Sequence, residues 1–275
     1  MGKLYVVGDV HGDIEALDKV VTTIKKDYSH KNEDLVIFVG DYIDRGRDSL
    51  GVINYLRNLN LNARYLMGNH DYEFLHNLTY FSNLKIENYS WWNLPGFLTF
   101  EARIGFMMVY QYEALQSFVE GLEKKGEYLE LLDYFKMNLH RINSRDLDFK
   151  ELNERLEQFR IMCQDIEVNY LPQLNFLSNL EYAIETDKYI ISHSGGDKNK
   201  PLINNTEEDW VWSRDYTTGK YTKDKEYIVG HTPTQSGEVE VDVENKHIFV
   251  DTGAIFYGVD IGLYITDYTY ATRIK

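Results

Sequence analysis

Three segments near the N-terminus share one pattern: a short apolar run, a glycine-rich polar turn, and then apolar residues at helical spacing. The apolar runs and the glycines that follow them are residues 4–7, 35–39 and 63–67, then Gly8, Gly40 and Gly68. Strands that alternate with helices at this pace predict β-α-β units and a largely parallel sheet. Because ligands bind beyond the carboxyl ends of parallel strands, we expect the three polar turns to meet at one edge of the sheet.

Short apolar runs return after about Asp187, at residues 189–192, 227–229, 239–243, 248–250 and 263–266. Alternation of acidic and apolar residues over 238–243 predicts a half-buried antiparallel strand, and residues 244–246 suit a hairpin turn. The C-terminal part is therefore expected to form a second, mostly antiparallel sheet. The predicted fold class is α/β, a two-sheet α/β/β/α sandwich.

The middle of the chain, about residues 83–180, has a different pattern. Apolar residues recur there at helical intervals among many Glu and Lys: Leu115, Phe118, Leu122, Leu132, Phe135, Leu139, Leu152, Leu156 and Phe159, with Pro172 as a late break. We expect a helical insertion within a single domain of residues 1–275. It either packs its own apolar stripe, the favoured interpretation, or serves as a lid over an active site. Trp91 and Trp92 are expected to pack a core rather than stack on a base.

Composition excludes several functions. The 275 residues carry 29 Lys and Arg against 44 Asp and Glu, a formal charge of −15, which disfavours a general nucleic-acid-coating role. Cys163 is the single cysteine, so neither an intramolecular disulfide nor a Cys-based zinc site is expected. The first apolar run is too short for a signal peptide or a membrane span, and we expect a cytoplasmic protein without a membrane anchor.

Five turns that follow predicted strands carry Asp, Asn or His: Asp9 and His11, Asp41, Asn69 and His70, His193, and His231. Carboxylate, imidazole and amide groups together suit a pair of divalent ions such as Mn, Fe or Zn better than Mg. One Asp-x-His alone is more often a solvated turn, and Asn69 could cap a helix. The coincidence of five such turns with five strand ends instead predicts a dinuclear metal site, with Mn as the first choice.

The ordered motifs resemble those of the calcineurin-like metallophosphoesterases, and more narrowly the bacterial and phage phosphoprotein phosphatases. The residues that carry the resemblance are GDVHG at 8–12, GDYIDRG at 40–46, GNHD at 68–71, His193, and GHTP at 230–233. The resemblance covers about residues 1–80 and 187–260, and it does not extend to the helical middle.

The resemblance implies roles for individual residues. One metal would be held by Asp9 and His11, the other by Asn69, His193 and His231, with Asp41 as the bridge. A hydroxide held between the ions would attack phosphorus in line, without a phosphoenzyme. The turn at residues 251–254 resembles the closing motif of the family and is expected to support the site without contacting metal.

The catalytic and phosphate-binding residues also follow from the resemblance. His70 would protonate the leaving oxygen, oriented by Asp44. Arg45, Arg214 and Asn69 would bind phosphate oxygens, the arginines through their planar forks. From the residues alone, Asp44 and Arg45 could also be a surface ion pair, and Arg214 could follow a pair of core tryptophans and merely contact solvent.

These motifs predict a metal-dependent phosphoester hydrolase, most simply a serine/threonine protein phosphatase acting on a phosphorylated protein. The alternative is a bis(5'-nucleosyl)-tetraphosphatase or another hydrolase of nucleotides or small phosphoesters. The tetraphosphatase family usually has Ala at the position of Asp44 and Trp at that of Thr232, which favours the phosphatase. An inactive scaffold is the remote alternative, because every metal and acid position is occupied.

Overall fold

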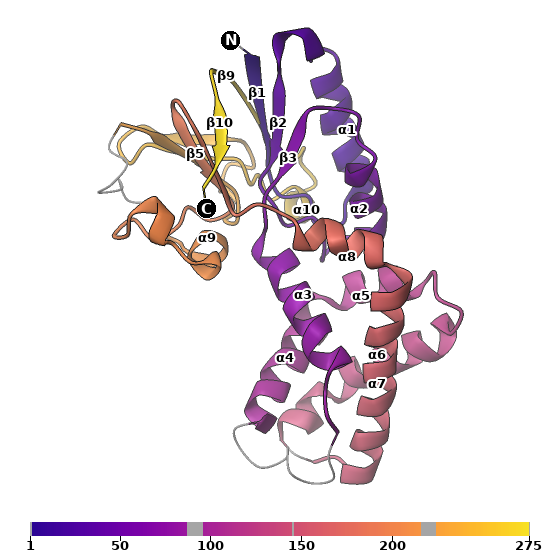
Figure 1. The fold of residues 1–275 in the computed structure, drawn as a ribbon. Coiled ribbons are helices and arrows are strands. Elements are labelled where there is room, and N and C mark those ends of the chain that lie inside the picture. Colours follow the sequence, from indigo (N-terminus) through magenta and orange to yellow (C-terminus); the bar gives the residue numbers. More distant parts are fainter. Residues whose placement is uncertain (1, 87–95, 145, 216–223, 275) are drawn as a thin grey trace.

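Residues 2–86, 96–144, 146–215 and 224–274 are described by the computed structural model (Figure 1). Trp91 and Trp92 lie outside these residues. The first sheet has the strand order β3-β2-β1-β9 and consists of β1 (Gly2–Val7), β2 (Leu35–Phe38), β3 (Ala63–Tyr65) and β9 (Leu263–Tyr268). β1, β2 and β3 are parallel, as predicted, whereas β9 pairs antiparallel with β1. The prediction that residues 263–266 belong to the second sheet is therefore wrong.

The second sheet is mixed and has the order β10-β4-β5-β6-β8-β7. Its strands are β4 (Ala183–Thr186), β5 (Tyr189–Ser192), β6 (Glu226–Val229), β7 (Glu240–Asp242), β8 (His247–Phe249) and β10 (Ala271–Arg273). The central strands β5, β6 and β8 are parallel. β10 with β4, β4 with β5, and β7 with β8 are antiparallel, so most pairings among the described strands of this sheet are antiparallel, as predicted.

From Leu4 to Val7, both faces of β1 are buried, which explains the unbroken apolar sequence of this part of the strand. Side chains alternate across a strand, so Leu4 and Val6 enter the core between the two sheets, while Tyr5 and Val7 face the helices. The first sheet packs against α1 (Ile14–Lys25) and α2 (Ser49–Arg57). On the outer face of the second sheet, α9 (Glu207–Trp212) buries Trp210. The layers therefore form the predicted α/β/β/α sandwich.

The described residues between β3 and β4 in the sequence form six helices: α3 (Asn69–Ser82), α4 (Gly96–Tyr110), α5 (Tyr112–Val119), α6 (Lys125–Asn143), α7 (Phe149–Asn169) and α8 (Leu171–Ser178). Figure 1 shows that most of them project away from the sheets. α3 packs on α7, and α4 packs on α6. The apolar stripe is buried as predicted, except that Leu139 is half-buried. Pro172 lies in the first turn of α8, where it marks the break after α7.

Three short helical segments complete the described elements: η1 (His30–Asn32), η2 (Leu202–Asn204) and α10 (Ala254–Tyr257). In the described part of the chain, no helix has both the length and the apolar character needed to cross a membrane.

Candidate metal centre and phosphate pocket

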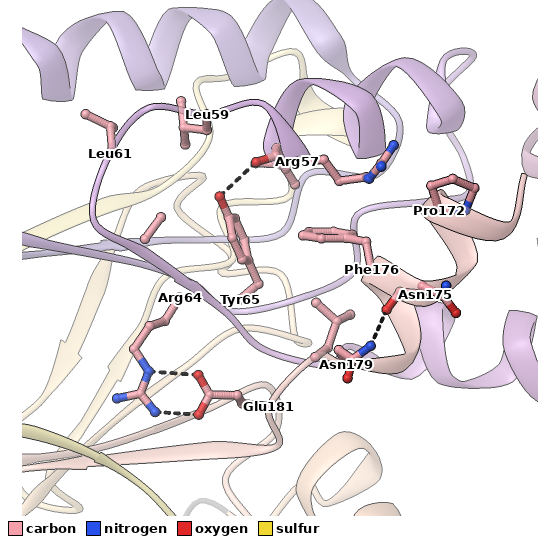
Figure 2. Close-up of a pocket in the computed structure, with 13 residues that line it drawn as sticks. Arg57, Leu59, Leu61, Arg64, Tyr65, Pro172, Asn175, Phe176, Asn179 and Glu181 are labelled. Atoms are coloured by element: carbon pink, nitrogen blue, oxygen red, sulfur yellow. Dashed lines mark hydrogen bonds and ion pairs between the residues drawn. The ribbon is translucent and has the colours of Figure 1, made fainter.

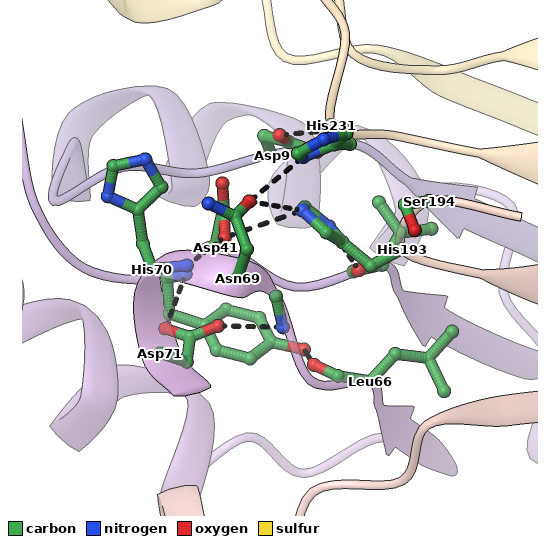
Figure 3. A network of polar contacts seen from close by, with 12 residues as sticks. Asp9, Asp41, Leu66, Asn69, His70, Asp71, His193, Ser194 and His231 are labelled. Atoms are coloured by element: carbon green, nitrogen blue, oxygen red, sulfur yellow. Dashed lines mark hydrogen bonds and ion pairs between the residues drawn. The ribbon is translucent and has the colours of Figure 1, made fainter. Parts of the chain in front are cut away.

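The polar turns meet at the carboxyl ends of the central strands of both sheets, where side chains from five separate turns converge (Figure 3). Each of the predicted metal ligands is buried there: Asp9, His11, Asp41, Asn69, His193 and His231. Asn69 and His70 are the first two residues of α3, so their side chains leave the helix start toward the other turns.

Asp41 lies at the centre of this cluster. Its Oδ2 is 3.5 Å from His11 Nε2, and its Oδ1 is 3.5 Å from His193 Nε2. Ligand atoms of Asp9, Asp41 and His193 lie within 4.8 Å of one another, and so do those of His11, Asp41 and His70. Asp41 is the member that both groups share, so its two oxygens can serve two ions at once.

The side chain of Asn69 contacts the two histidines that come later in the sequence, His193 and His231. Its Oδ1 lies 3.0 Å from His193 Nε2 and 2.9 Å from His231 Nδ1 (Figure 3). The backbone N–H of His231 also donates to the Asp9 carboxylate at 3.2 Å. Which of the two ions each ligand would hold stays a prediction.

The chemistry of the donors fits a pair of divalent ions. Backbone carbonyls accept from the Nδ1 atoms, His11 to Ile43 at 3.1 Å and His193 to Val39 at 3.0 Å, which leaves each Nε2 facing Asp41. Burial lowers the pKa of both imidazoles and keeps them in the neutral form that binds metal. His231 Nε2 is buried with no hydrogen-bond partner among the described residues. The set contains no thiolate and accommodates Mn, Fe or Zn.

The carboxylates of the cluster also fit bound cations. Burial raises the pKa of Asp9 well above its usual value, and the neighbouring Asp251 and Asp41 charges raise it further. Asp251 Oδ1 accepts a hydrogen bond of 2.8 Å from the Gly253 N–H and so closes its own turn. Divalent cations would offset the repulsion among these buried carboxylates.

Five site residues adopt a left-handed backbone conformation that L-residues rarely take: His11 (φ 49°), Asp41 (50°), Asp44 (70°), Arg45 (66°) and His231 (67°). Each such residue costs about 1–3 kcal/mol and persists only where its surroundings impose it. The His11 N–H donates to the Asp41 carbonyl at 2.8 Å, and the Gly46 N–H donates to the His11 carbonyl at 3.0 Å. The turns therefore hold one another in the strained conformations that aim their side chains inward.

Asp71 joins two of the turns. Its fully buried carboxylate accepts the Tyr42 N–H at 3.0 Å and the Gly68 N–H at 3.1 Å (Figure 3). Gly68 must be glycine because an added Cβ would overlap the backbone nitrogen and Oδ1 of Asp41. The second and third turns are thus packed directly on each other.

His70 and Asp44 form a buried pair. The Nδ1 of His70 donates to Asp44 Oδ2 at 2.6 Å. Burial raises the pKa of Asp44 to about 6, although the contact with His70 pulls it down. Burial lowers the pKa of His70, but Asp41 and Asp44 outweigh it and the net shift is upward. Gln111, between α4 and α5, donates from Nε2 to the His70 carbonyl at 3.2 Å.

Two arginines line the same pocket, which holds about 230 Å³ above the metal ligands. The guanidinium of Arg45 lies 2.6 Å from His11 Nε2 and 3.1 Å from His70 Nε2, and it stacks on Phe256 at 4.6 Å. Arg214 donates to Thr232 Oγ1 at 2.7 Å. Their forks therefore flank the space directly in front of the cluster, where a phosphate would sit.

The pocket wall contains aromatic residues that sequence reasoning missed: Phe106 and Tyr110 from α4, and Trp212 at the end of α9. Helical spacing could not separate Phe106 and Tyr110 from core positions, because they belong to a largely apolar helix. Trp210 packs in the core, whereas Trp212 is 38% exposed and faces the pocket. The insertion therefore both packs its own core and supplies one wall of the site.

A larger cavity lies elsewhere, between α2, β3 and α8, and holds about 590 Å³ (Figure 2). An ion pair between Arg64 and Glu181 lines this cavity, and Arg64 Nε donates a hydrogen bond to the Glu181 carboxylate at 2.7 Å. The described residues that line it include no cluster of metal ligands. Both candidate metal-ligand groups instead contain Asp41, which lines the pocket of about 230 Å³.

Residues 2–261 match the family described as calcineurin-like phosphoesterase. The chain belongs to this family. It is a metallophosphoesterase with a buried cluster of His and Asp side chains suited to metal.

Relatives of the metallophosphoesterase include a symmetrical bis(5'-nucleosyl)-tetraphosphatase of Marinomonas sp. (strain MWYL1). It is 23% identical over 274 residues, which cover 96% of this chain and 94% of the relative. The corresponding protein of Legionella pneumophila (strain Corby) is 38% identical over 71 residues, which cover 26% of this chain and only 25% of the relative.

A solved structure confirms the fold of the metallophosphoesterase. It is the cold-active protein-tyrosine phosphatase of a psychrophile Shewanella sp., which superposes with a TM-score of 0.52 at 14% identity. The superposition covers 100% of this chain and 81% of that phosphatase.

Proposed function

We propose that this metallophosphoesterase hydrolyses a dinucleoside polyphosphate such as diadenosine tetraphosphate. The observation that carries the proposal is the end-to-end match with a symmetrical bis(5'-nucleosyl)-tetraphosphatase, which covers 94% of that protein. The aromatic wall of Phe106, Tyr110 and Trp212 supports it, because such rings stack on nucleobases as well as they pack on each other. The proposal replaces the protein phosphatase as the favoured substrate class.

The chemistry divides between the ions and the chain. When bound, two divalent ions supply Lewis acidity and lower the pKa of a water molecule. Arg45 and Arg214 bind the equatorial oxygens of the scissile phosphate and neutralise charge that grows during the displacement. His70 donates the proton on Nε2 to the leaving oxygen, while the Asp44 carboxylate holds Nδ1–H and stabilises the imidazolium.

A serine/threonine protein phosphatase is the second candidate, and the buried His70–Asp44 pair favours it. A serine alkoxide is a poor leaving group and depends strongly on general-acid protonation, whereas a nucleoside diphosphate leaves readily as an anion. A general acid oriented by a 2.6 Å hydrogen bond, as His70 is, therefore increases the rate of hydrolysis most for alkyl phosphates.

Substrate competition tests the proposal. The Mn-loaded protein is given diadenosine tetraphosphate and a phosphoserine peptide at equal concentration, and products are separated by anion exchange. We expect two ADP per dinucleotide and a kcat/KM at least about tenfold above that for the peptide, a difference of about 1.4 kcal/mol in transition-state binding. A faster reaction on the peptide would move the assignment to the protein phosphatase.

The control for both substrates is Asp41→Asn. Asp41 lies within reach of both candidate ion positions, so both activities should fall together in this variant. An activity that survives undiminished in Asp41→Asn would contradict a reaction that depends on this metal centre.

A further inference from the structure

A second cavity adjoins the catalytic pocket. It holds about 480 Å³ and is lined by residues of α3 and α4: Glu73, Asn77, Thr99, Ala102, Arg103 and Phe106. Phe106 also lines the catalytic pocket of about 230 Å³, so the two cavities meet at this ring. Ligand pockets usually offer about 300–1,000 Å³. The catalytic pocket alone therefore accommodates a phosphate and little more, whereas the adjoining cavity has room for a nucleoside.

Arg103 gives the second cavity its positive charge. Its Nη1 donates to Asn77 Oδ1 at 2.7 Å, and its guanidinium lies over the Tyr80 ring at 5.0 Å. The Nε atom is buried without a hydrogen-bond partner among the described residues. Nε itself is out of reach of a ligand, but the side chain as a whole is half-buried and lines the cavity, so its terminal N–H groups can contact phosphate oxygens there. Such a cation matters in a chain whose formal charge is −15.

Buried hydrogen bonds fix Arg103 relative to the proposed general acid. Asn77, which accepts from Arg103, donates from Nδ2 to Gln111 Oε1 at 3.2 Å. Gln111 in turn donates to the His70 carbonyl at 3.2 Å, and both amides are fully buried. The rings of His70 and Phe106 lie 6.4 Å apart between centroids. The second cavity is therefore on the His70 side of the catalytic pocket, where the leaving group departs.

We propose that the cavity between α3 and α4 is the subsite for the leaving nucleotide. Arg103 binds its phosphate oxygens, Phe106 stacks on its flat ring, and the Glu73 carboxylate accepts hydrogen bonds from its hydroxyl or amino groups. The inference rests on the proposed function, and it assigns the selection of a nucleotide to α3 together with α4 of the helical insertion. The shared metal motifs carry no information about this choice.

The test uses Arg103→Met and a matched control, Arg155→Met. Arg155 is also an insertion arginine stacked on a tyrosine, 4.8 Å over Tyr134, but it lines a different cavity. Two quantities are measured for each variant. One is the ratio of kcat/KM for diadenosine tetraphosphate to that for p-nitrophenyl phosphate, which has no nucleoside. The other is the dissociation constant for ADP in metal-stripped protein, by calorimetry.

Loss of an arginine–phosphate contact costs about a tenfold change in affinity or more. We therefore expect Arg103→Met to lower the kinetic ratio about tenfold and to weaken ADP binding by a similar factor, with Arg155→Met unchanged in both. Arg103→Lys keeps the charge but loses the planar fork and its stacking on Tyr80, so its affinity for ADP should lie between those of the wild type and Arg103→Met.

Ala102→Trp tests the same nucleotide subsite without changing Arg103. Ala102 lies exposed on α4 and lines the cavity, so an indole there fills the space without disturbing the buried hydrogen bonds. It should weaken ADP binding as Arg103→Met does. ADP affinity that is unchanged in both variants, or absent from the wild type, overturns the subsite.

Failure of the proposed function gives a different result. In that case the wild type does not hydrolyse diadenosine tetraphosphate, and the ADP measurements alone decide whether the cavity binds nucleotides. Arg103-dependent binding then supports the subsite, and equal binding in all variants rejects it.

Discussion

Asp44→Asn tests how the buried pair acts. Asp44 is fully buried and accepts the His70 Nδ1–H at 2.6 Å. Asparagine has the same size and an oxygen that still accepts this hydrogen bond, but it carries no charge. A hydrogen bond to a charged group is worth about 1.5–3 kcal/mol and a neutral one about 0.5–1.5. The difference of about 1.4 kcal/mol corresponds to about a tenfold loss of kcat.

His70→Asn should cost more, because it removes the proton donor itself. General-acid catalysis contributes about 10²- to 10⁴-fold, so we expect a loss of at least about a hundredfold on an alkyl ester such as glycerol 2-phosphate. On p-nitrophenyl phosphate the loss should be much smaller, since nitrophenolate leaves without a proton. If Asp44 acts only through His70, adding Asp44→Asn to His70→Asn should cause no further loss.

The assay is steady-state turnover of the wild type, both single variants and the double variant on these two phosphoesters. Metal content is measured in each preparation, so that a lost ion is not mistaken for a lost proton donor. Equal losses on glycerol 2-phosphate and p-nitrophenyl phosphate, or a full additional tenfold loss in the double variant, would refute the proposed role of the pair.

Three further predictions concern the metal ions and stability. Adding Mn at about 100 times its dissociation constant to stripped protein should raise the free energy of unfolding by about 2.7 kcal/mol, and the melting temperature by about 5–10 °C; an unchanged melting temperature would contradict a specific site. Gly68→Ala should abolish metal retention in elemental analysis because its Cβ overlaps Asp41, whereas the control Gly105→Ala, with nothing within 4 Å of the added Cβ, should retain it. Burial lowers the pKa of Lys198 to about 7 from 10.5, so an unfolded chain binds the extra proton between these pH values. The stability of the wild type relative to Lys198→Met should therefore rise from pH 7 to about pH 9 in urea titrations, and a flat difference would contradict the lowered pKa.

The site was largely predictable because its chemistry is local in sequence. Each turn combines a strand end, a glycine and a polar side chain within a few residues, and parallel strands bring such turns to the same edge. The cluster around Asp41 follows from that rule. The hydrogen bond that Asp71 accepts from the Gly68 N–H is also local in sequence. The hydrogen bond that Asp71 accepts from the Tyr42 N–H instead depends on how two turns pack.

The parts that could not be predicted depend on contacts between distant segments. The sequence of residues 263–266 predicts a strand, but it does not indicate that this strand pairs with β1. The sequence pattern predicts neither of the short strands β4 and β10. For β10 the reason is plain, because its sequence Ala-Thr-Arg contains no apolar run. Phe106 and Gln111 belong to the insertion, and only its packing against α3 brings them to His70.

Metal stoichiometry tests the central claim most directly. The stripped protein is reloaded with Mn, passed through a desalting column, and analysed for metal per chain by mass spectrometry. We expect two ions per chain in the wild type and fewer than one in Asp41→Asn, because Asp41 offers an oxygen to each side of the cluster. One ion or none in the wild type, or two retained ions in Asp41→Asn, would contradict a dinuclear centre built around this carboxylate.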